Sequence, residues 1–462
     1  MRADIEASIP SNIEIDLKPG EIVYSENGSY TVRVDDTIQR AERILEKIGI
    51  TAIYRSDEQG TTRLPIVKLN RALGKARCHR FACLSAPPPT PLNRPPREVF
   101  GKGVSESQCK ASAMMEAVER YCGQKFAHSR TVHVPYEKVK DWSIHPSEFK
   151  FPSLPPKCAS CPDRERGCFQ DLNRVSKEWT WGYSLLRKVP VLVPSAVVYY
   201  PYISDEAESF MFNDTGGLSS GNTIEEAILH GIAEIVERDA LFYDFNLGNL
   251  ENAHLVNLAQ SKSKYIQECV SCLDPLQSIF IFLIANREMK LEIPSFSAFV
   301  CYKRGNARRY FGGSGTSLNP EIGLLRALTE MEQQKVRQGV IGRLDASTLV
   351  TRTDLDPENA ITLGEVPNRS TGNVKGDIEL YLDEFSNIGT DVIVVDLTHP
   401  EIKIPVVRVL VPKLVAYSGS AVKEEVFLKG MKRSGIDESE ERLSGPLDHS
   451  RLSAQAAEVL DK

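Results

Sequence analysis

Residues 230–239 read His-Gly-Ile-Ala-Glu-Ile-Val-Glu-Arg-Asp, and this stretch decides how the chain is interpreted. Its two glutamates, Glu234 and Glu237, are three residues apart and alternate with apolar side chains. Residues three and four apart share one face of an α-helix, so the spacing predicts an amphipathic helix with a stripe of carboxylates. Similar stretches occur at residues 112–120 and 326–333. The chain therefore repeats one chemical pattern three times.

The first additional stretch carries Glu116 and Glu119, and the second carries Glu330 followed by the amide Gln333. So many carboxylates would repel one another if they met without a counterion. Oxygen ligands select hard cations, and Mg²⁺ is typically held by one or two carboxylates, waters and phosphate oxygens. The recurrence therefore suggests a magnesium-nucleotide site.

A simpler interpretation exists for any one copy, because Glu-x-x-Glu-Arg is common on solvated helix faces with local ion pairs. Three copies in matching contexts weaken that interpretation. Each copy lies beside an apolar face, and each follows an expected glycine turn, at Gly103, Gly221 or Gly315. We therefore favour one shared site.

Cationic side chains stand next to the carboxylates. Lys102, Arg238 and Arg326 could donate to the oxygens of a triphosphate, although each could instead form a local salt bridge. His230 could contact phosphate or substrate, or serve as a hydrogen-bonded structural histidine. The chain has no Gly-x-x-x-x-Gly-Lys-Ser/Thr loop, so bound ATP would require an unusual site.

These stretches resemble the motifs of the YcaO family, whose members bind ATP through three such helices and phosphorylate peptide backbone amides. The likeness extends over about residues 37–414. The matching segments are residues 101–116, residues 220–239, Arg326 to Glu330 with Gln333, residues 179–182, residues 193–194, residues 395–398 and residues 404–408.

The resemblance implies a mixed α/β (α+β) fold of repeated subdomains, with strands interleaved with the three carboxylate-bearing helices around one nucleotide site. It implies ATP and Mg²⁺ as ligands. The catalytic and metal-binding carboxylates would be Glu116, Glu119, Glu234, Glu237 and Glu330. The nucleotide-binding residues would be Ser112, Lys102, Arg238, Arg326 and Gln333. The family's further nucleotide contacts near the chain start have no clear counterpart here, although Thr37, Arg40 and Arg43 lie on an expected early helix.

The activity implied is ATP-dependent activation of a peptide or protein backbone amide. A nucleophile adds to the carbonyl carbon, the resulting oxygen is phosphorylated and phosphate leaves, giving an azoline, an amidine or a thioamide. Azoline-forming members often end in a proline-rich tail, whereas this chain ends in a polar one. This difference favours the thioamide-forming group, which acts with a TfuA-like partner. The alternative is a non-catalytic, nucleotide-binding accessory protein that assists another modifying enzyme, for example in ribosomal protein methylthiolation.

Composition sets wider limits. The chain has 462 residues, 41% of them hydrophobic, and a formal net charge of -6. A large hydrophobic core is expected, and the charge disfavours nucleic acid as a partner. No apolar run is long enough to span a bilayer, so we expect a cytoplasmic protein without a membrane partner. We also expect a homo-oligomer.

A proline-rich stretch at residues 87–96 suggests a boundary. We expect an N-terminal α/β part over residues 1–84, a core with the ATP motifs over residues 85–415 and a polar tail over residues 416–462. Apolar segments predict strands at residues 191–200, 279–285, 295–302, 392–397 and 406–411.

Ten cysteines in such a chain are more typical of thiols or metal ligands than of disulfides. Cys158, Cys161 and Cys168 lie in a turn-rich stretch that could form part of a Zn²⁺ site. Cys269 and Cys272 could complete that site, or they could simply share a helical face.

Overall fold

The computed structural model describes residues 2–25, 28–45, 50–55, 81–85, 97–129, 131–149, 176–202, 214–242, 253–258, 261–271, 277–284, 289, 291–304, 307–337 and 360–416. Within these residues, helices and strands are mixed along the chain, and the sheets are largely antiparallel. The predicted mixed α/β fold is confirmed.

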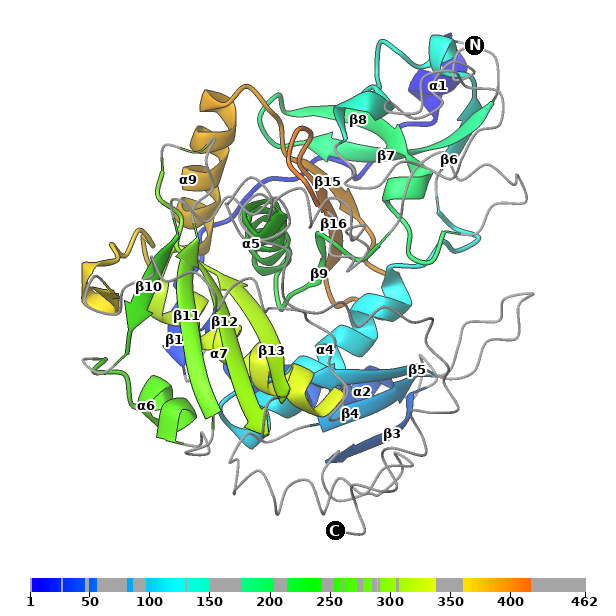
Figure 1. Cartoon of the computed structure of the whole chain (residues 1–462). Helices are drawn as coiled ribbons and strands as arrows, with labels where there is room; N and C mark the ends of the chain where they lie inside the picture. The colour runs from blue at the N-terminus through cyan, green and yellow to red at the C-terminus, as the bar shows by residue number, and fades with distance from the viewer. Residues whose placement is uncertain are drawn as a thin grey trace.

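Three sheets of the described chain each support one of the carboxylate-bearing helices (Figure 1). The first contains β3 (Ile50–Arg55), β4 (Phe81–Ser85) and β5 (Arg97–Gly101), in that order. The second contains, in spatial order, β6 (Thr131–Val134), β7 (Lys177–Ser184), β15 (Ile393–Asp396), β16 (Val406–Leu410) and β9 (Leu218–Ser220), with β8 (Val189–Pro194) paired to β7. The third contains β13 (Ala307–Thr316), β12 (Ser295–Arg304), β11 (Gln277–Ile284), β10 (His254–Asn257) and β14 (Ile361–Thr362).

The three helices lie on these sheets and approach one another near the middle of the molecule (Figure 1). Helix α4 (Glu106–Cys122) packs on β4 and β5, α5 (Ile224–Leu241) packs on β9 and β16, and α7 (Pro320–Arg337) packs on β12 and β13. Helix α2 (Val34–Leu45) covers α4, and α9 (Val374–Asn387) packs beside α5. A strand, a short connection and a helix thus recur in each unit.

The starts of these helices follow from the sequence. The Ser105 side chain caps α4 by accepting from the Gln108 N–H at 3.2 Å. The Thr223 side chain caps α5 by accepting from the Glu226 N–H, also at 3.2 Å. Helix α7 begins at Pro320, whose fixed φ suits the first helical position. Local chemistry therefore sets where each carboxylate stripe begins.

The apolar face of each motif helix forms part of the core. On α5, Ile228, Ile232 and Ile235 are fully buried against the second sheet and α9. The corresponding faces of α4 and α7 are also buried, with Met114 and Leu324 fully enclosed. Burial of this face turns the opposite, polar face of each helix toward the middle of the molecule.

Four predicted strands agree with β11, β12, β15 and β16 to within two residues at either end. The fifth prediction, at residues 191–200, was too long, because β8 ends at Pro194 and a 3-10 turn follows over Ser195–Val197. The Ser195 hydroxyl contacts Thr180 on β7, and its carbonyl accepts from the Val198 N–H at 3.0 Å. The turn keeps Val197 and Val198 buried, so their apolar character did not distinguish it from a strand.

The predicted turn at Gly315 was also wrong, because Gly315 lies inside β13. A Cβ atom there would stand 2.2 Å from the carbonyl oxygen of Gly323 and 2.6 Å from the Ala327 nitrogen. The glycine lets β13 approach α7 closely.

Within the described residues, no helix is long and apolar enough to cross a lipid bilayer. The domain limits stay predictions, and residues 86–96 and 417–462 lie outside the described residues.

Candidate functional site

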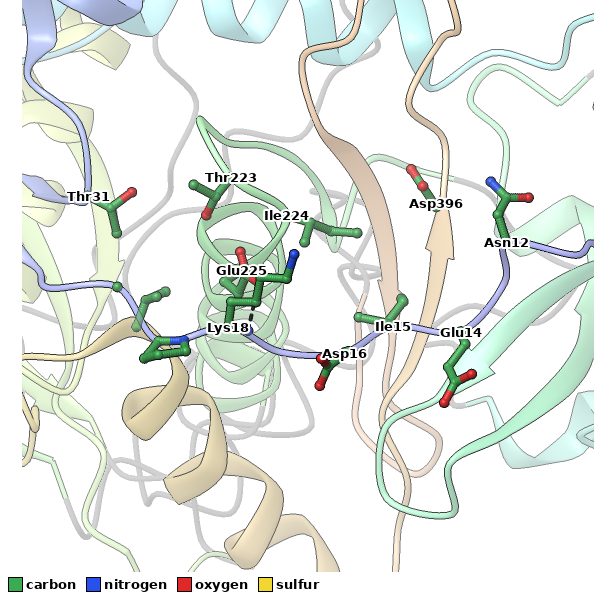
Figure 2. Close-up of a pocket in the computed structure, with 13 residues that line it drawn as sticks. Asn12, Glu14, Ile15, Asp16, Lys18, Thr31, Thr223, Ile224, Glu225 and Asp396 are labelled. Carbon is green, nitrogen blue, oxygen red and sulfur yellow. Dashed lines mark hydrogen bonds between the residues drawn. The ribbon is translucent and has the colours of Figure 1, made fainter.

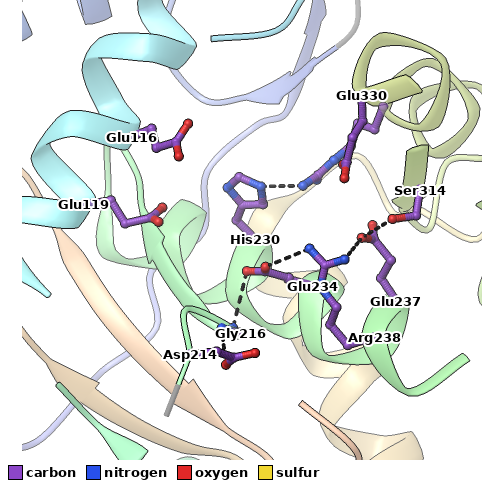
Figure 3. A network of polar contacts seen from close by, with 12 residues as sticks. Glu116, Glu119, Asp214, Gly216, His230, Glu234, Glu237, Arg238, Ser314 and Glu330 are labelled. Atoms are coloured by element: carbon purple, nitrogen blue, oxygen red, sulfur yellow. Dashed lines mark hydrogen bonds and ion pairs between the residues drawn. The ribbon is translucent and has the colours of Figure 1, made fainter. Parts of the chain in front are cut away.

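The carboxylates of the three helices turn toward one region (Figure 3). Helix α4 provides Glu116 and Glu119, α5 provides Glu234 and Glu237, and α7 provides Glu330. The pKa values reflect this proximity. The charge of Glu234 contributes to the raised pKa of Glu119, and the charge of Glu330 contributes to the raised pKa of Glu237. The structure therefore brings together the carboxylates that the sequence pattern singled out.

Arg238 lies between the two carboxylates of its own helix. Its Nη2 is 3.3 Å from Glu234 Oε1, and its Nη1 is 3.4 Å from Glu237 Oε1. The Ser314 hydroxyl on β13 donates to Glu237 Oε1 at 2.7 Å (Figure 3). The local ion pair considered for Arg238 is thus present, and it lies inside the carboxylate cluster rather than on a solvated face.

Helix α4 carries Glu119, a buried acid with a raised pKa. Burial raises the pKa of Glu119 to about 8; Arg120 opposes this shift, while the charges of Glu116 and Glu234 add to it. The Arg120 guanidinium is 3.3 Å from Glu116 and 3.6 Å from Glu119. One arginine therefore faces two carboxylates and does not compensate the buried one.

Lys102 links the β5 edge to α7. Its Nζ is 2.5 Å from Glu330 Oε2. Burial alone would raise the pKa of Glu330, but Lys102 and Arg238 outweigh it, so the pKa lies below its usual value. Burial raises the pKa of Glu237, and Glu330 is among the charges that add to this shift. Neighbouring carboxylates thus differ in how far nearby cations offset their burial.

His230 forms a hydrogen bond with the Arg326 guanidinium across the α5–α7 interface (Figure 3). Burial lowers the pKa of His230 well below its usual value, and the charges of Arg326 and Lys102 lower it further. His230 itself is nevertheless exposed. The hydrogen bond to Arg326 agrees with a structural role, and contact of His230 with phosphate or substrate stays a prediction.

Ser112 and Gln333 hold the segment that carries Lys102. The Ser112 hydroxyl accepts from the Lys102 backbone N–H at 3.3 Å, and Gln333 donates to the Phe100 carbonyl at 2.9 Å. Gln333 thereby ties α7 to β5. Contact of Ser112 or Gln333 with nucleotide stays a prediction.

The early helix was correctly expected, because Thr37, Arg40 and Arg43 lie on α2. The Thr37 hydroxyl contacts Asn222 Oδ1 at 2.9 Å, and Arg40 Nη1 donates to the Asn222 carbonyl at 2.8 Å. Arg43 is exposed. Two of the three residues thus reach the start of α5.

Sequence reasoning gave no role to Asp214, Gly217 or Arg408. The Gly217 N–H donates to Glu234 Oε2 at 3.3 Å, and Arg408 Nη1 donates to the Asp214 carbonyl at 2.9 Å. Arg408 belongs to one of the segments on which the family resemblance rested. The signal available in the sequence was an arginine within the otherwise apolar run of residues 406–411.

Several buried charges of the cluster are incompletely paired. Glu119 and Glu237 have raised pKa values because they are buried with too little positive charge. At the same time, three buried guanidinium nitrogens have no hydrogen-bond partner in the described structure, namely Arg120 Nη1, Arg238 Nε and Arg408 Nε. Unpaired buried donors are costly. A metal ion would supply positive charge to the carboxylates, and a phosphate bound to it would supply acceptor oxygens to guanidinium donors.

The donor set fits Mg²⁺ with a nucleotide better than a metal held by protein alone. Among the residues that the structure describes, no group of three or more His, Cys, Asp or Glu side chains is arranged to hold a metal ion. Mg²⁺ usually takes only one or two carboxylates and completes its shell with water and substrate phosphates. The expected Zn²⁺ ligands Cys158, Cys161 and Cys168 lie outside the described residues.

A cavity of about 580 Å³ lies elsewhere, between the N-terminal segment and the start of α5 (Figure 2). Lys18 donates its backbone N–H to Glu225 there at 2.9 Å. None of the five clustered glutamates lines this cavity. The convergence of charges, and not this cavity, therefore marks the candidate site.

A family model described as "YcaO cyclodehydratase, ATP- and Mg²⁺-binding" matches residues 100–415. An uncharacterized protein of Methanothermobacter thermautotrophicus is 28% identical over 414 residues, covering 84% of this chain and 95% of that protein. An uncharacterized protein in the tfuA 3' region of Rhizobium leguminosarum bv. trifolii is 26% identical over 363 residues, covering 70% of this chain and 78% of that protein.

Two solved structures are similar in fold. A heterocyclase in complex with substrate and cofactor aligns with a TM-score of 0.68 and 22% identity over 87% of this chain, which spans 55% of the heterocyclase. YcaO from Methanopyrus kandleri, bound with AMPPCP and Mg²⁺, aligns with a TM-score of 0.60 and 21% identity, over 84% of this chain and 93% of that one.

Proposed function

The chain belongs to the YcaO family, and from this premise we propose that it is an ATP- and Mg²⁺-dependent enzyme that activates a backbone amide. The substrate is a peptide or protein, ATP is the co-substrate, and the products are ADP, phosphate and a thioamide or azoline. The observation that carries the proposal is the incomplete pairing of buried charges at the cluster. Burial raises the pKa of Glu119 despite the neighbouring Arg120, and one buried nitrogen in each of Arg120 and Arg238 has no hydrogen-bond partner.

The residues divide by charge. Magnesium ions would each be held by one or two of the carboxylates and would supply charge neutralisation at the phosphates when bound. The candidate carboxylates are Glu116, Glu119, Glu234, Glu237 and Glu330. Arg238, Arg326 and Lys102 would donate to phosphate oxygens. Phosphoryl transfer depends mainly on alignment and on neutralising charge, so these groups suffice in kind without a side-chain nucleophile.

The amide chemistry balances in three steps. A nucleophile adds to the carbonyl carbon, the former carbonyl oxygen accepts the phosphoryl group, and the C–O bond breaks to release phosphate. External sulfide as nucleophile leaves sulfur in place of oxygen, whereas a neighbouring thiol or hydroxyl closes a ring with net loss of water. The site residues named above act on the oxygen in either case, so they do not select the nucleophile.

We favour thioamide formation with a TfuA-like partner. This choice is supported by the family resemblance and by the relative encoded in a tfuA 3' region. We place the reaction in the cytoplasm, where thiols stay reduced, and we retain the homo-oligomer as an expectation. Zinc has no part in the proposal.

Phosphate release tests the proposal. The purified protein, Mg²⁺ and ATP are incubated with a candidate peptide and sulfide. Released phosphate is measured, and the mass of the peptide is determined by mass spectrometry. A change of about +16 Da marks sulfur exchanged for oxygen, and a change of about -18 Da marks ring closure. Glu116→Gln should abolish peptide-dependent phosphate release.

The matched control is Glu137→Gln. Glu137 is ion-paired with Lys140 at 3.0 Å and 45% exposed, whereas Glu116 is paired at 3.3 Å and 33% exposed. The control should keep full activity. The wild type could instead bind nucleotide without phosphate release or a change in peptide mass when substrate and partner are supplied. That result would refute the enzymatic function and favour the accessory-protein alternative.

A further inference from the structure

Arg408 is a charged residue in the middle of β16, and the roles proposed above do not explain why its guanidinium contacts Asp214. Its side chain is nearly fully buried, with 3% of the residue exposed. Its Nη1 donates to the Asp214 carbonyl at 2.9 Å, and its Nη2 is 3.9 Å from the Asp214 carboxylate. Burying a guanidinium is unfavourable unless ion pairs and hydrogen bonds offset the loss of hydration.

Those contacts fix one loop. The Asp214 carboxylate accepts from the Gly216 N–H at 2.9 Å, and the Gly217 carbonyl accepts from the Val409 N–H at 2.8 Å. Arg408 and Val409, neighbours on β16, thus hold the loop at both ends. Gly217 has a φ of 77°, and a Cβ atom there would stand 2.3 Å from the Val409 oxygen. The loop accordingly has little freedom to move away from β16.

The fixed loop presents one donor to the carboxylate cluster. The Gly217 N–H meets Glu234 Oε2 at 3.3 Å, while Glu234 Oε1 faces Arg238 (Figure 3). Both oxygens of Glu234 are therefore oriented, one by the loop and one by an arginine. We propose that Arg408 is a positioning residue, which sets the orientation of Glu234 for Mg²⁺-nucleotide binding through the loop of residues 214–217. This inference rests on the proposed function.

Direct metal binding tests the inference apart from turnover. Mn²⁺ replaces Mg²⁺ as a paramagnetic probe, and its affinity is measured by electron paramagnetic resonance with a non-hydrolysable ATP analogue. Arg408→Lys keeps the charge, but a single ammonium cannot reproduce the planar fork that reaches two oxygens of Asp214. We expect it to weaken Mn²⁺ binding about tenfold, the usual effect of losing a group that orients a metal ligand.

The control is Arg187→Lys, because Arg187 also pairs with an aspartate, Asp391 at 2.8 Å, but is half exposed and lies in the β7–β8 turn. It should leave Mn²⁺ affinity unchanged. Glu234→Gln supplies the decisive comparison. If Arg408 acts through Glu234, adding Arg408→Lys to Glu234→Gln should weaken binding no further.

Two results together support the inference. Arg408→Lys should bind Mn²⁺ about tenfold more weakly while still unfolding cooperatively, and its effect should not add to that of Glu234→Gln in the double variant. Unchanged affinity, or additive losses, overturns it. If Arg408→Lys does not fold, Asp214→Ala removes the acceptor of the Gly216 N–H and is judged by the same two criteria. Failure of the wild type to bind the probe overturns this inference and the proposed function together. Wild-type binding without amide phosphorylation overturns only the proposed function.

Discussion

Glu119→Gln should stabilise the nucleotide-free protein, and more so as the pH rises. The glutamine keeps the shape of the side chain and resembles the protonated acid. In the folded protein burial raises the pKa of Glu119 from 4.5 to about 8. The folded state therefore holds a proton that the unfolded chain loses, and the free energy of unfolding falls as the pH rises through this window.

The size of the effect follows from the shift. At 1.36 kcal/mol per pH unit, the full shift corresponds to about 5 kcal/mol. Between pH 5 and pH 8 about 3 kcal/mol of this should develop, since ionisation is incomplete at both ends. The advantage of Glu119→Gln over wild type should grow by that amount. Its side chain is only 13% exposed, so solvent screening removes little of the effect.

Urea unfolding of both proteins at pH 5 and pH 8, without nucleotide, measures the difference. Glu137→Gln is the control, because its side chain is exposed, and its effect on stability should be equal at the two pH values. An advantage of Glu119→Gln that stays constant or shrinks from pH 5 to pH 8 would refute the reasoning. Glu119→Gln should also bind Mg²⁺-nucleotide more weakly, so stability and ligand affinity should change in opposite directions.

Three further predictions follow from the same cluster. Binding of Mg²⁺ with a non-hydrolysable ATP analogue at pH 7 should release about one proton, mostly from Glu119. Calorimetry in buffers of different ionisation enthalpy measures this proton release, and a binding heat that does not depend on the buffer would contradict the prediction. Lys102→Met removes the 2.5 Å pair with Glu330 and should cost about 2 kcal/mol at pH 7 in urea unfolding. Since the pKa of Glu330 is lowered, that loss should shrink below pH 4.5, and a loss that grows in acid argues against it. Gly315→Ala would place a Cβ 2.2 Å from the α7 backbone and should cost about 2 kcal/mol in urea unfolding, whereas Gly364→Ala, with no atom closer than 3.9 Å, should be neutral; equal effects would refute the packing argument.

The sequence predicted the positions of the motif glutamates on their helices better than it predicted the surrounding contacts, for a physical reason. Helical periodicity is local, so Glu234 and Glu237 could be placed on one helix face from spacing alone. Family resemblance then related that helix to the other two. The loop at Gly217 is attached through the contact between Arg408 and Asp214, which are 194 positions apart in the chain, and no local pattern reports such a contact. Gly315 was misjudged because a glycine that permits close packing looks the same in sequence as one in a turn.

The electrostatics of the cluster argue that it is kept for binding and not for stability. A structural network would pair each buried carboxylate with a donor, as Lys102 pairs with Glu330. Glu119 instead shares Arg120 with Glu116, and buried nitrogens of three arginines lack acceptors. Each imbalance destabilises the free protein, and the proposed Mg²⁺ would relieve the one at the carboxylates. Three helices on three separate sheets hold these charges in place, so the fold bears this cost before any ligand arrives.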